Sequence, residues 1–255
     1  MTPMNAIVKT ASWLLAIVPW SLGSHASEAS RIEFEGVSYR VFHARPDEIE
    51  LHWKDASGQA YAQFSRLQAA LEAKGRQTEF LMNAGIFEPG GAPSGLHVEK
   101  GVELQPLNLH EGKGNFYLKP NGVFAVAGGK ALVMESGDFA RSGIRPTLGL
   151  QSGPLLLRHG TIHPEFQANS PNRKHRNGVG IVAATGQIVF AITELQPLSN
   201  RVNLHGFARM FQHLGCKDAL FLDGDISEMI VKPAGVVPSG NRLGAFLAVT
   251  KEAQR

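Results

Sequence analysis

Short apolar runs separated by turn-forming residues follow one another along most of this chain, and they limit the folds that it can adopt. The first runs, at 31–34, 38–44 and 49–53, have the length of β-strands. Only 18% of the 255 residues are charged and 43% are hydrophobic, so a packed core is feasible and a disordered chain is excluded. The 28 glycines favour a domain rich in strands and turns over a helical bundle or a coiled coil.

Two segments have apolar residues at helical spacing instead. The first ends before Gly75 and carries Phe64, Leu67, Ala70 and Leu71. The second begins after a candidate N-cap, Asn203, ends before Gly215 and carries Leu204, Phe207, Ala208, Phe211 and Leu214. Further strands are predicted within 80–134 and at 155–158, 179–193, 219–222 and 243–250. We therefore expect an α+β fold: a single domain with a mostly antiparallel mixed sheet and two or three flanking helices.

Two hairpin turns are predicted from local sequence. Asn121-Gly122 is a type I′ turn signal. For the strands within 179–193, a two-residue turn at Thr185-Gly186 sets Arg176 opposite Leu195, and a three-residue turn sets it opposite Glu194.

The first 26 residues have the pattern of a secretory signal. An apolar stretch at 11–22 is followed by Ser24-His25-Ala26, which has small residues where a signal peptidase cleaves. The stretch is short for a membrane span, and no second one follows, although an uncleaved anchor is the alternative. We expect a signal peptide at 1–26, cleavage near Ala26, a domain at 27–255 and a periplasmic or secreted protein without a stable membrane span.

Charge and cysteine content narrow the function classes. The formal net charge is +3, and no basic tract interleaved with aromatic residues is present, so we expect no nucleic-acid partner. The single cysteine, Cys216, cannot form an intramolecular disulfide, and a buried, inert thiol is the favoured interpretation.

Polar clusters at the ends of apolar runs are the candidate site. The first is Asn83-Ala84-Gly85, and the second is Arg145-Pro146-Thr147 with Gln151-Ser152-Gly153-Pro154. Both are also ordinary turn sequences. Ser152 lacks the flanking glycines of a nucleophile elbow, so a serine hydrolase is a weak hypothesis.

The segment 173–178 is the densest positive patch in the chain. An arginine such as Arg176 can bind a phosphate through two parallel hydrogen bonds, which makes anion binding a hypothesis beside that of a solvated basic loop.

The acidic cluster Asp223-Gly224-Asp225 follows a predicted buried strand. Its two carboxylates can act as a base or nucleophile, bind a metal, or shape a turn. The spacing fits no EF-hand, and the histidines at 159, 163 and 175 have no zinc spacing, so we expect no metal or other cofactor, without excluding a divalent ion.

Taken in order, these clusters resemble the phosphodiester glycosidase family over residues 78–250. The matching motifs are Asn83 to Phe87, Gly114 to Phe116, Lys119 to Phe124, Gln151 to Pro154, Ile162-His163-Pro164, Arg176 to Gly180, and Leu222-Asp223-Gly224 with Ser227 and Met229. The family groups exported bacterial proteins with the lysosomal uncovering enzyme, N-acetylglucosamine-1-phosphodiester alpha-N-acetylglucosaminidase. The match is closer to the bacterial branch, because the lysosomal sequence Asp-Gly-Gly-Gly-Ser-Ser is Asp-Gly-Asp-Ile-Ser-Glu at 223–228 here.

The resemblance implies a hydrolase that cleaves the glycosidic C–O bond of a sugar-1-phosphodiester, carried by a small molecule or glycan, to free sugar and a phosphomonoester. Asp223 is the expected nucleophile or base, with Asp225 as the alternative, and Arg176, with Arg145, is the expected phosphate clamp. Substrate-binding positions are expected at Asn83, Gly85, Arg145, Ser152, Gly153, His163, Thr193, Gly224 and Ser227. The alternatives are a periplasmic protein that binds glycan or phosphoglycan without catalysis and a phosphodiesterase that cleaves the P–O bond.

Overall fold

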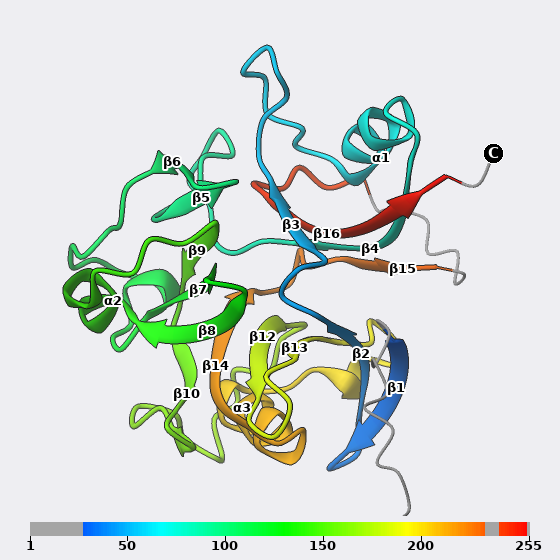
Figure 1. Ribbon diagram of the computed structural model, residues 1–255. Helices are drawn as coiled ribbons and strands as arrows, with labels where there is room; N and C mark the ends of the chain where they lie inside the picture. The colour runs from blue at the N-terminus through cyan, green and yellow to red at the C-terminus, as the bar shows by residue number, and fades with distance from the viewer. Residues whose placement is uncertain (1–27, 233–239, 254–255) are drawn as a thin grey trace, which may run out of the picture.

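Three antiparallel sheets are packed around a shared core in the computed structural model, which describes residues 28–232 and 240–253 (Figure 1). The large sheet has the strand order β1 (Glu28–Phe34), β2 (Val37–Ala44), β13 (Ile188–Thr193), β12 (Asn177–Val182), β14 (Cys216–Asp223), β10 (Leu155–Arg158) and β11 (Thr161–Ile162). The second sheet has the order β15 (Met229–Val231), β4 (Arg76–Asn83), β16 (Phe246–Glu252) and β3 (Ile49–His52). The third has the order β6 (Val102–Gln105), β5 (His97–Glu99), β9 (Leu148–Ser152), β7 (Gly122–Ala127) and β8 (Lys130–Glu135).

The helices lie outside these sheets. They are α1 (Phe64–Glu72), α2 (Ser136–Ser142) and α3 (Leu204–His213), with short 3₁₀ turns η1 (Asn115–Tyr117) and η2 (Leu198–Asn200). The predicted α+β fold is confirmed, including the opening order of three strands and a helix, although its strands form three sheets instead of one.

The predicted cap of α3 is also present. The side-chain oxygen of Asn203 accepts a 2.8 Å hydrogen bond from the Gly206 amide, and Gly215 adopts φ +78 after the helix ends.

Aromatic side chains from different sheets form the centre of the core. Phe80 of β4 stacks on Phe42 of β2 at 4.4 Å between ring centroids and on Phe190 of β13 at 4.9 Å. The opposite face of the large sheet is covered by α3 (Figure 1). Gly180 of β12 permits this contact, because a Cβ there would lie 2.8 Å from the ring of Phe211. The two faces of this sheet are therefore separate environments, which matters for the site.

The turn predicted at Asn121-Gly122 is wrong. Gly122 is the first residue of β7 and pairs with Glu135, and the hairpin of β7 and β8 turns at Gly128-Gly129, where φ is +55 and +74. The Asn121 side chain is buried and donates a 2.8 Å hydrogen bond to the Phe116 carbonyl. A tertiary contact has thus overridden a local turn preference.

Both registers predicted for the hairpin of β12 and β13 are wrong as well. The Val182 amide donates to the Gln187 carbonyl at 2.9 Å, so the connection spans the four residues 183–186. The ladder then sets Arg176 opposite Thr193, whose amide donates to the Arg176 carbonyl at 3.0 Å.

The predicted signal peptide at 1–26 lies outside the described residues, so that prediction stands untested. Within the described part of the chain, no helix has the length and apolar character needed to cross a membrane.

Candidate active site

Polar residues from all three sheets meet where four strands begin or end. Asn83 ends β4, Ser152 ends β9, Asp223 ends β14, and Asn177 begins β12. Asn177 lies opposite Asp223 in the ladder of the large sheet. The site therefore brings together residues from all four of the clusters predicted from sequence, at a junction that no single segment could form.

Asn83 connects these strands. Its side-chain nitrogen donates to Asp223 Oδ2 at 2.9 Å, and its side-chain oxygen accepts from Asn177 Nδ2 at 2.9 Å and from the Glu228 amide at 3.0 Å. Only 1% of Asn83 is exposed, so these bonds form out of water. Because both ends of the amide are committed, its orientation is fixed, and its N–H group is directed at Asp223.

A β-bulge aims Asp223 at Asn83. Asn177 pairs with Asp223 and Gly178 pairs with Phe221, so Leu222 is an extra residue in β14. The bulge reverses the alternation of β14 and turns Asp223 toward the face of the sheet where Asn83 lies. Without the bulge, Asp223 would share the α3-facing side of Phe221.

The Asp223 carboxyl group is oriented and hard to ionise. It is half-buried, and burial raises its pKa to about 6, although the Gly224 amide, which donates to Oδ1 at 2.7 Å, and Asn83 both act to lower it. Each carboxylate oxygen thus has one fixed donor and keeps capacity for a further partner. A carboxylate with a pKa near neutrality is a good general base and a competent nucleophile.

This pKa shift has a consequence for stability. Because the pKa of Asp223 is higher in the folded chain than in the unfolded one, its stabilising contribution is full below about pH 4 and is lost as pH rises through about 6. We expect the free energy of unfolding of the parent, relative to that of the Asp223→Asn variant, to fall by about 2–3 kcal/mol between pH 4 and pH 8. Denaturant unfolding of both proteins at several pH values measures this; a constant difference would contradict the buried carboxylate.

The three glycines predicted at the site, Gly85, Gly153 and Gly224, each have a structural role. Gly85 has φ +81, and a Cβ at that position would lie 3.3 Å from the Cβ of Ser152. A Cβ at Gly153 would lie 2.6 Å from the Cβ of Asn121, so this position excludes side chains. Gly224 supplies the amide that holds Asp223.

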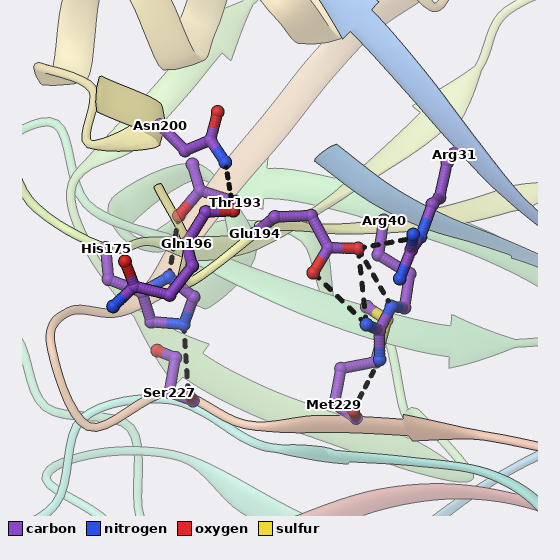
Figure 2. Close-up of polar contacts among 9 residues, drawn as sticks. All are labelled: Arg31, Arg40, His175, Thr193, Glu194, Gln196, Asn200, Ser227 and Met229. Atoms are coloured by element: carbon purple, nitrogen blue, oxygen red, sulfur yellow. Dashed lines mark hydrogen bonds and ion pairs between the residues drawn. The ribbon is translucent and has the colours of Figure 1, made fainter. Parts of the chain in front are cut away.

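A buried histidine that sequence analysis did not select links two of the predicted residues. His175 Nδ1 lies 2.7 Å from Thr193 Oγ1, and its Nε2 lies 3.0 Å from the Ser227 carbonyl oxygen (Figure 2). Since a carbonyl only accepts, Nε2 carries the proton and the threonine hydroxyl donates to Nδ1. Burial lowers the pKa of His175, which agrees with this neutral form. The only sequence signal for His175 was its place in the basic segment.

A second set of contacts joins Glu194, which follows β13, to Met229, which begins β15. Glu194 accepts from Arg40 Nη2 at 3.1 Å and from Arg31 Nε at 3.0 Å, and Arg40 also donates to the Met229 carbonyl at 3.4 Å (Figure 2). The predicted pairing of Arg176 with Glu194 is replaced by this network. It fixes the start of β15 beside the end of β13.

Several predicted substrate-binding side chains are buried and committed to other protein groups. Ser152 donates from Oγ to the Leu222 carbonyl at 3.0 Å, and Thr193 accepts at Oγ1 from the Arg176 amide at 3.1 Å. Asn83, Ser152, Thr193 and Ser227 are each at most 2% exposed. In the structure Asn83, Ser152 and Thr193 therefore position neighbouring groups, and substrate contact by these four residues stays a prediction. Ser227 Oγ itself is buried without a hydrogen-bond partner among the described residues.

Arg176 points away from Asp223. Its side chain lies on the α3-facing side of the large sheet, with the guanidinium carbon 5.4 Å from the Phe221 ring centroid, whereas Asn177 points to Asn83. Nε donates to the Val202 carbonyl at 2.8 Å and Nη2 to the Asn172 carbonyl at 3.0 Å. Burial lowers the pKa of Arg176 to about 10, so it remains charged at neutral pH.

The charge of Arg176 has no counter-ion and borders a pocket. No carboxylate lies within 4.0 Å of it in the part of the chain that the structure describes. The pocket has a volume of about 200 Å³ and is lined by residues from four segments: Asn115, Leu118, Glu165, Phe166, Gln167, Ser170, Asn172, Arg176, Leu204 and His205. A buried, unpaired guanidinium beside a polar pocket is a suitable anion site.

Two other predicted residues, Asp225 and Arg145, do not contact Asp223 in the structure. Asp225 is exposed and accepts from Lys174 at 2.7 Å and from the His175 amide at 3.1 Å; burial acts to raise its pKa, but these donors hold it below the ordinary value. Arg145 is exposed, precedes β9 at the opposite end of that strand from Ser152, and does not line the Arg176 pocket. The structure therefore does not bring Arg145 to Arg176.

His163 supports the pocket instead of lining it. It is 4% exposed and stacks on Phe166 at 4.6 Å between ring centroids, and Phe166 lines the Arg176 pocket. Among the described residues, no three His, Cys, Asp or Glu side chains are grouped so as to hold a metal ion.

Comparison with known proteins shows relatives in sequence and in fold. The family described as phosphodiester glycosidase matches residues 76–249. An uncharacterized protein of Escherichia coli K12, YigE, is 35% identical over 193 residues, which cover 75% of this chain and 72% of that protein. The catalytic domain of zebrafish N-acetylglucosamine-1-phosphodiester alpha-N-acetylglucosaminidase, auto-inhibited by its pro-peptide, has a TM-score of 0.62 at 15% identity, with 88% of this chain and 82% of that chain covered. A hypothetical protein from Synechocystis has a TM-score of 0.53 at 14% identity, with 88% and 61% covered.

Proposed function

The chain belongs to the phosphodiester glycosidase family, and from that membership we propose that it hydrolyses the glycosidic C–O bond of a sugar-1-phosphodiester. The products would be the free sugar and a phosphomonoester. The observation that carries this proposal is Asp223, a half-buried carboxyl group with its pKa raised to about 6, oriented by Asn83 within the matched residues.

The chemistry of the leaving group agrees with a single carboxylate. A phosphomonoester has a second pKa of about 6, so it departs without strong protonation by a general acid. The site must then supply a group that meets the positive charge developing at the anomeric carbon and a group that binds the phosphate. Asp223 is our candidate for the first, as nucleophile or as base for the attacking water. Asp225 is disfavoured, because its carboxylate is already paired with Lys174.

Arg176 is our candidate for the phosphate. Its guanidinium lies on the other face of the large sheet from Asp223, but Arg176 directly precedes Asn177, the ladder partner of Asp223. A phosphodiester lying across this end of β12 and β14 would place its sugar at Asp223 and its phosphate toward the Arg176 pocket. The pocket's polar lining and unpaired charge support this assignment.

We expect Arg176→Lys to raise the KM for a sugar-1-phosphodiester about 10- to 100-fold. Lysine keeps the charge but loses the planar guanidinium that donates to Val202 and Asn172 while facing the pocket. Steady-state kinetics measures this, with Arg173→Lys, an exposed neighbour, as the matched control. An unchanged KM and kcat in folded Arg176→Lys would remove Arg176 from phosphate binding.

The reaction itself is tested with a panel of sugar-1-phosphodiesters in heavy-oxygen water, with and without chelator. Heavy oxygen in the released sugar is the expected result, because water attacks the anomeric carbon. Heavy oxygen in the phosphate would identify a P–O cleaving phosphodiesterase instead. Saturable binding without product would identify a glycan-binding protein, and loss of turnover with chelator would reveal a divalent metal requirement.

We also propose that the protein acts outside the cytoplasm, on the basis of the signal-like segment at 1–26. Mass spectrometry of the N-terminus of protein recovered from the periplasm tests it. A new N-terminus near residue 27 is expected, and an intact Met1 on cytoplasmic protein would contradict it.

A further inference from the structure

The loop between β13 and α3 presents two leucines to water. Leu195 is 59% exposed and Leu198 is 62% exposed, and we call residues 195–199 the leucine loop. Ile226, 39% exposed, lies on the loop that follows Asp223. The two loops are neighbours, because His175 joins Thr193 to Ser227 (Figure 2). Exposed apolar side chains thus lie on the two loops that His175 joins next to the candidate active site.

The leucine loop is held in this shape by a buried asparagine. Asn200, 3% exposed, donates from Nδ2 to the Gln196 carbonyl at 2.8 Å (Figure 2). Its Oδ1 accepts from the Ser38 amide at 3.0 Å. Its own amide donates to the Pro197 carbonyl at 2.9 Å. The fold therefore fixes the loop backbone to β2 while its leucines stay outside the core. Exposed leucines on a fixed loop indicate a contact surface.

Unpaired basic residues flank the leucine loop. Arg173 donates from Nε to the Arg201 carbonyl at 3.0 Å, and Arg201 directly follows η2. Both side chains are exposed, and neither has a carboxylate within 4.0 Å in the described ranges, unlike Lys174 and Arg31, which pair with Asp225 and Glu194. Their positive charge is thus not neutralised by a direct ion pair in the described ranges, although Arg201 also acts on Asp225, and it can attract anions beside the leucine loop.

We propose that the leucine loop binds the surface of an anionic phospholipid membrane. Leu195 and Leu198 enter the interfacial region, and Arg173 and Arg201 contact lipid phosphates. Apolar side chains next to free cations are the combination that gives reversible interfacial binding. This binding needs no catalysis and so stands apart from the proposed function, but it would bring membrane-borne phosphodiesters to the loop that follows Asp223.

The test is sedimentation of the full chain with vesicles of phosphatidylglycerol and phosphatidylethanolamine. We expect the partition coefficient of the double variant Leu195→Ser/Leu198→Ser to be at least about tenfold below that of the parent. Vesicles of phosphatidylcholine alone, or high salt, should weaken binding of the parent, and so should Arg173→Gln/Arg201→Gln.

The matched control is Val102→Ser/Leu104→Ser, which removes comparably exposed apolar residues from β6 of the third sheet and should bind as the parent does. All variants share the N-terminal segment, so it cannot produce a difference between them. Equal binding by the parent and Leu195→Ser/Leu198→Ser, or no binding by the parent, overturns the proposal. Self-association of the parent that this variant abolishes, without vesicle binding, would identify a second copy of the chain as the occupant.

Discussion

Replacing Asp223 by asparagine is expected to lower turnover of a sugar-1-phosphodiester by about a thousandfold or more. Asparagine keeps the size of the side chain but supplies neither a nucleophile nor a base at the anomeric carbon. The fold should persist, because asparagine keeps the shape of the side chain and its one amide oxygen can still accept from either Asn83 or the Gly224 amide. Initial rates on the phosphodiester panel, with thermal unfolding of each protein, measure this.

The control for Asp223 is Asp225→Asn, which removes a carboxylate of the same cluster that is paired with Lys174 and exposed. This variant should keep its rate within a fewfold of the parent. In the parent, kcat/KM should rise with pH and level off above about 6, because the ionised form of Asp223 is the active one. Full activity in folded Asp223→Asn, or a rate that falls as pH rises through 6, would contradict the assignment.

Replacing Asn83 by alanine should give the second large effect, a loss of about a hundredfold in kcat. Three partners lose a hydrogen bond at once: Asp223, Asn177 and the Glu228 amide. Because the Asn83 N–H group stabilises the ionised carboxylate, its removal should also move the acidic limb of the pH profile to above 6. The pH dependence of kcat/KM measures this shift, which a merely destabilised enzyme would not show.

Asn203→Ala is the control for Asn83. It removes the N-cap of α3, and about 1 kcal/mol of stability, from an asparagine that does not touch Asp223. Its acidic limb should stay where it is in the parent. If the acidic limb of the kcat/KM profile of Asn83→Ala lies at the same pH as in the parent, Asn83 does not act on Asp223.

Two of the three described helices, α1 and α3, and most strands could be predicted from sequence because their signals are local; α2 was not located. Apolar spacing located α1 and α3, and the preference of Asn203 for an N-cap gave the start of α3. The turns failed where tertiary contacts outweighed local preference. Asn121 is buried against Phe116 rather than exposed in a turn, and the hairpin of β12 and β13 has four connecting residues, which moved Arg176 opposite Thr193.

The candidate site could be predicted only in part, because local signals mark its residues but tertiary contacts decide which of them meet. Asn83, Ser152 and Asp223 stood out as polar residues at strand ends, and the structure brings them together. His175 and Asn177 were not selected, because their partners, Ser227 and Asn83, lie on distant segments that only the tertiary structure brings near them. Arg145 was selected as the basic residue of the second polar cluster, and it lies at the opposite end of β9 from Ser152.

By itself, the sequence determined the family, the α+β class and the identity of the polar residues at the strand ends, because motif order, apolar spacing and turn preferences are written in neighbouring residues. The tertiary structure alone decided which of those residues meet. A one-residue bulge at Leu222 turned Asp223 toward Asn83, while the ordinary alternation of β12 sent Arg176 to the opposite face. Side-chain direction in a sheet reverses with each residue, so the composition of the site depends on register, and long-range packing sets the register.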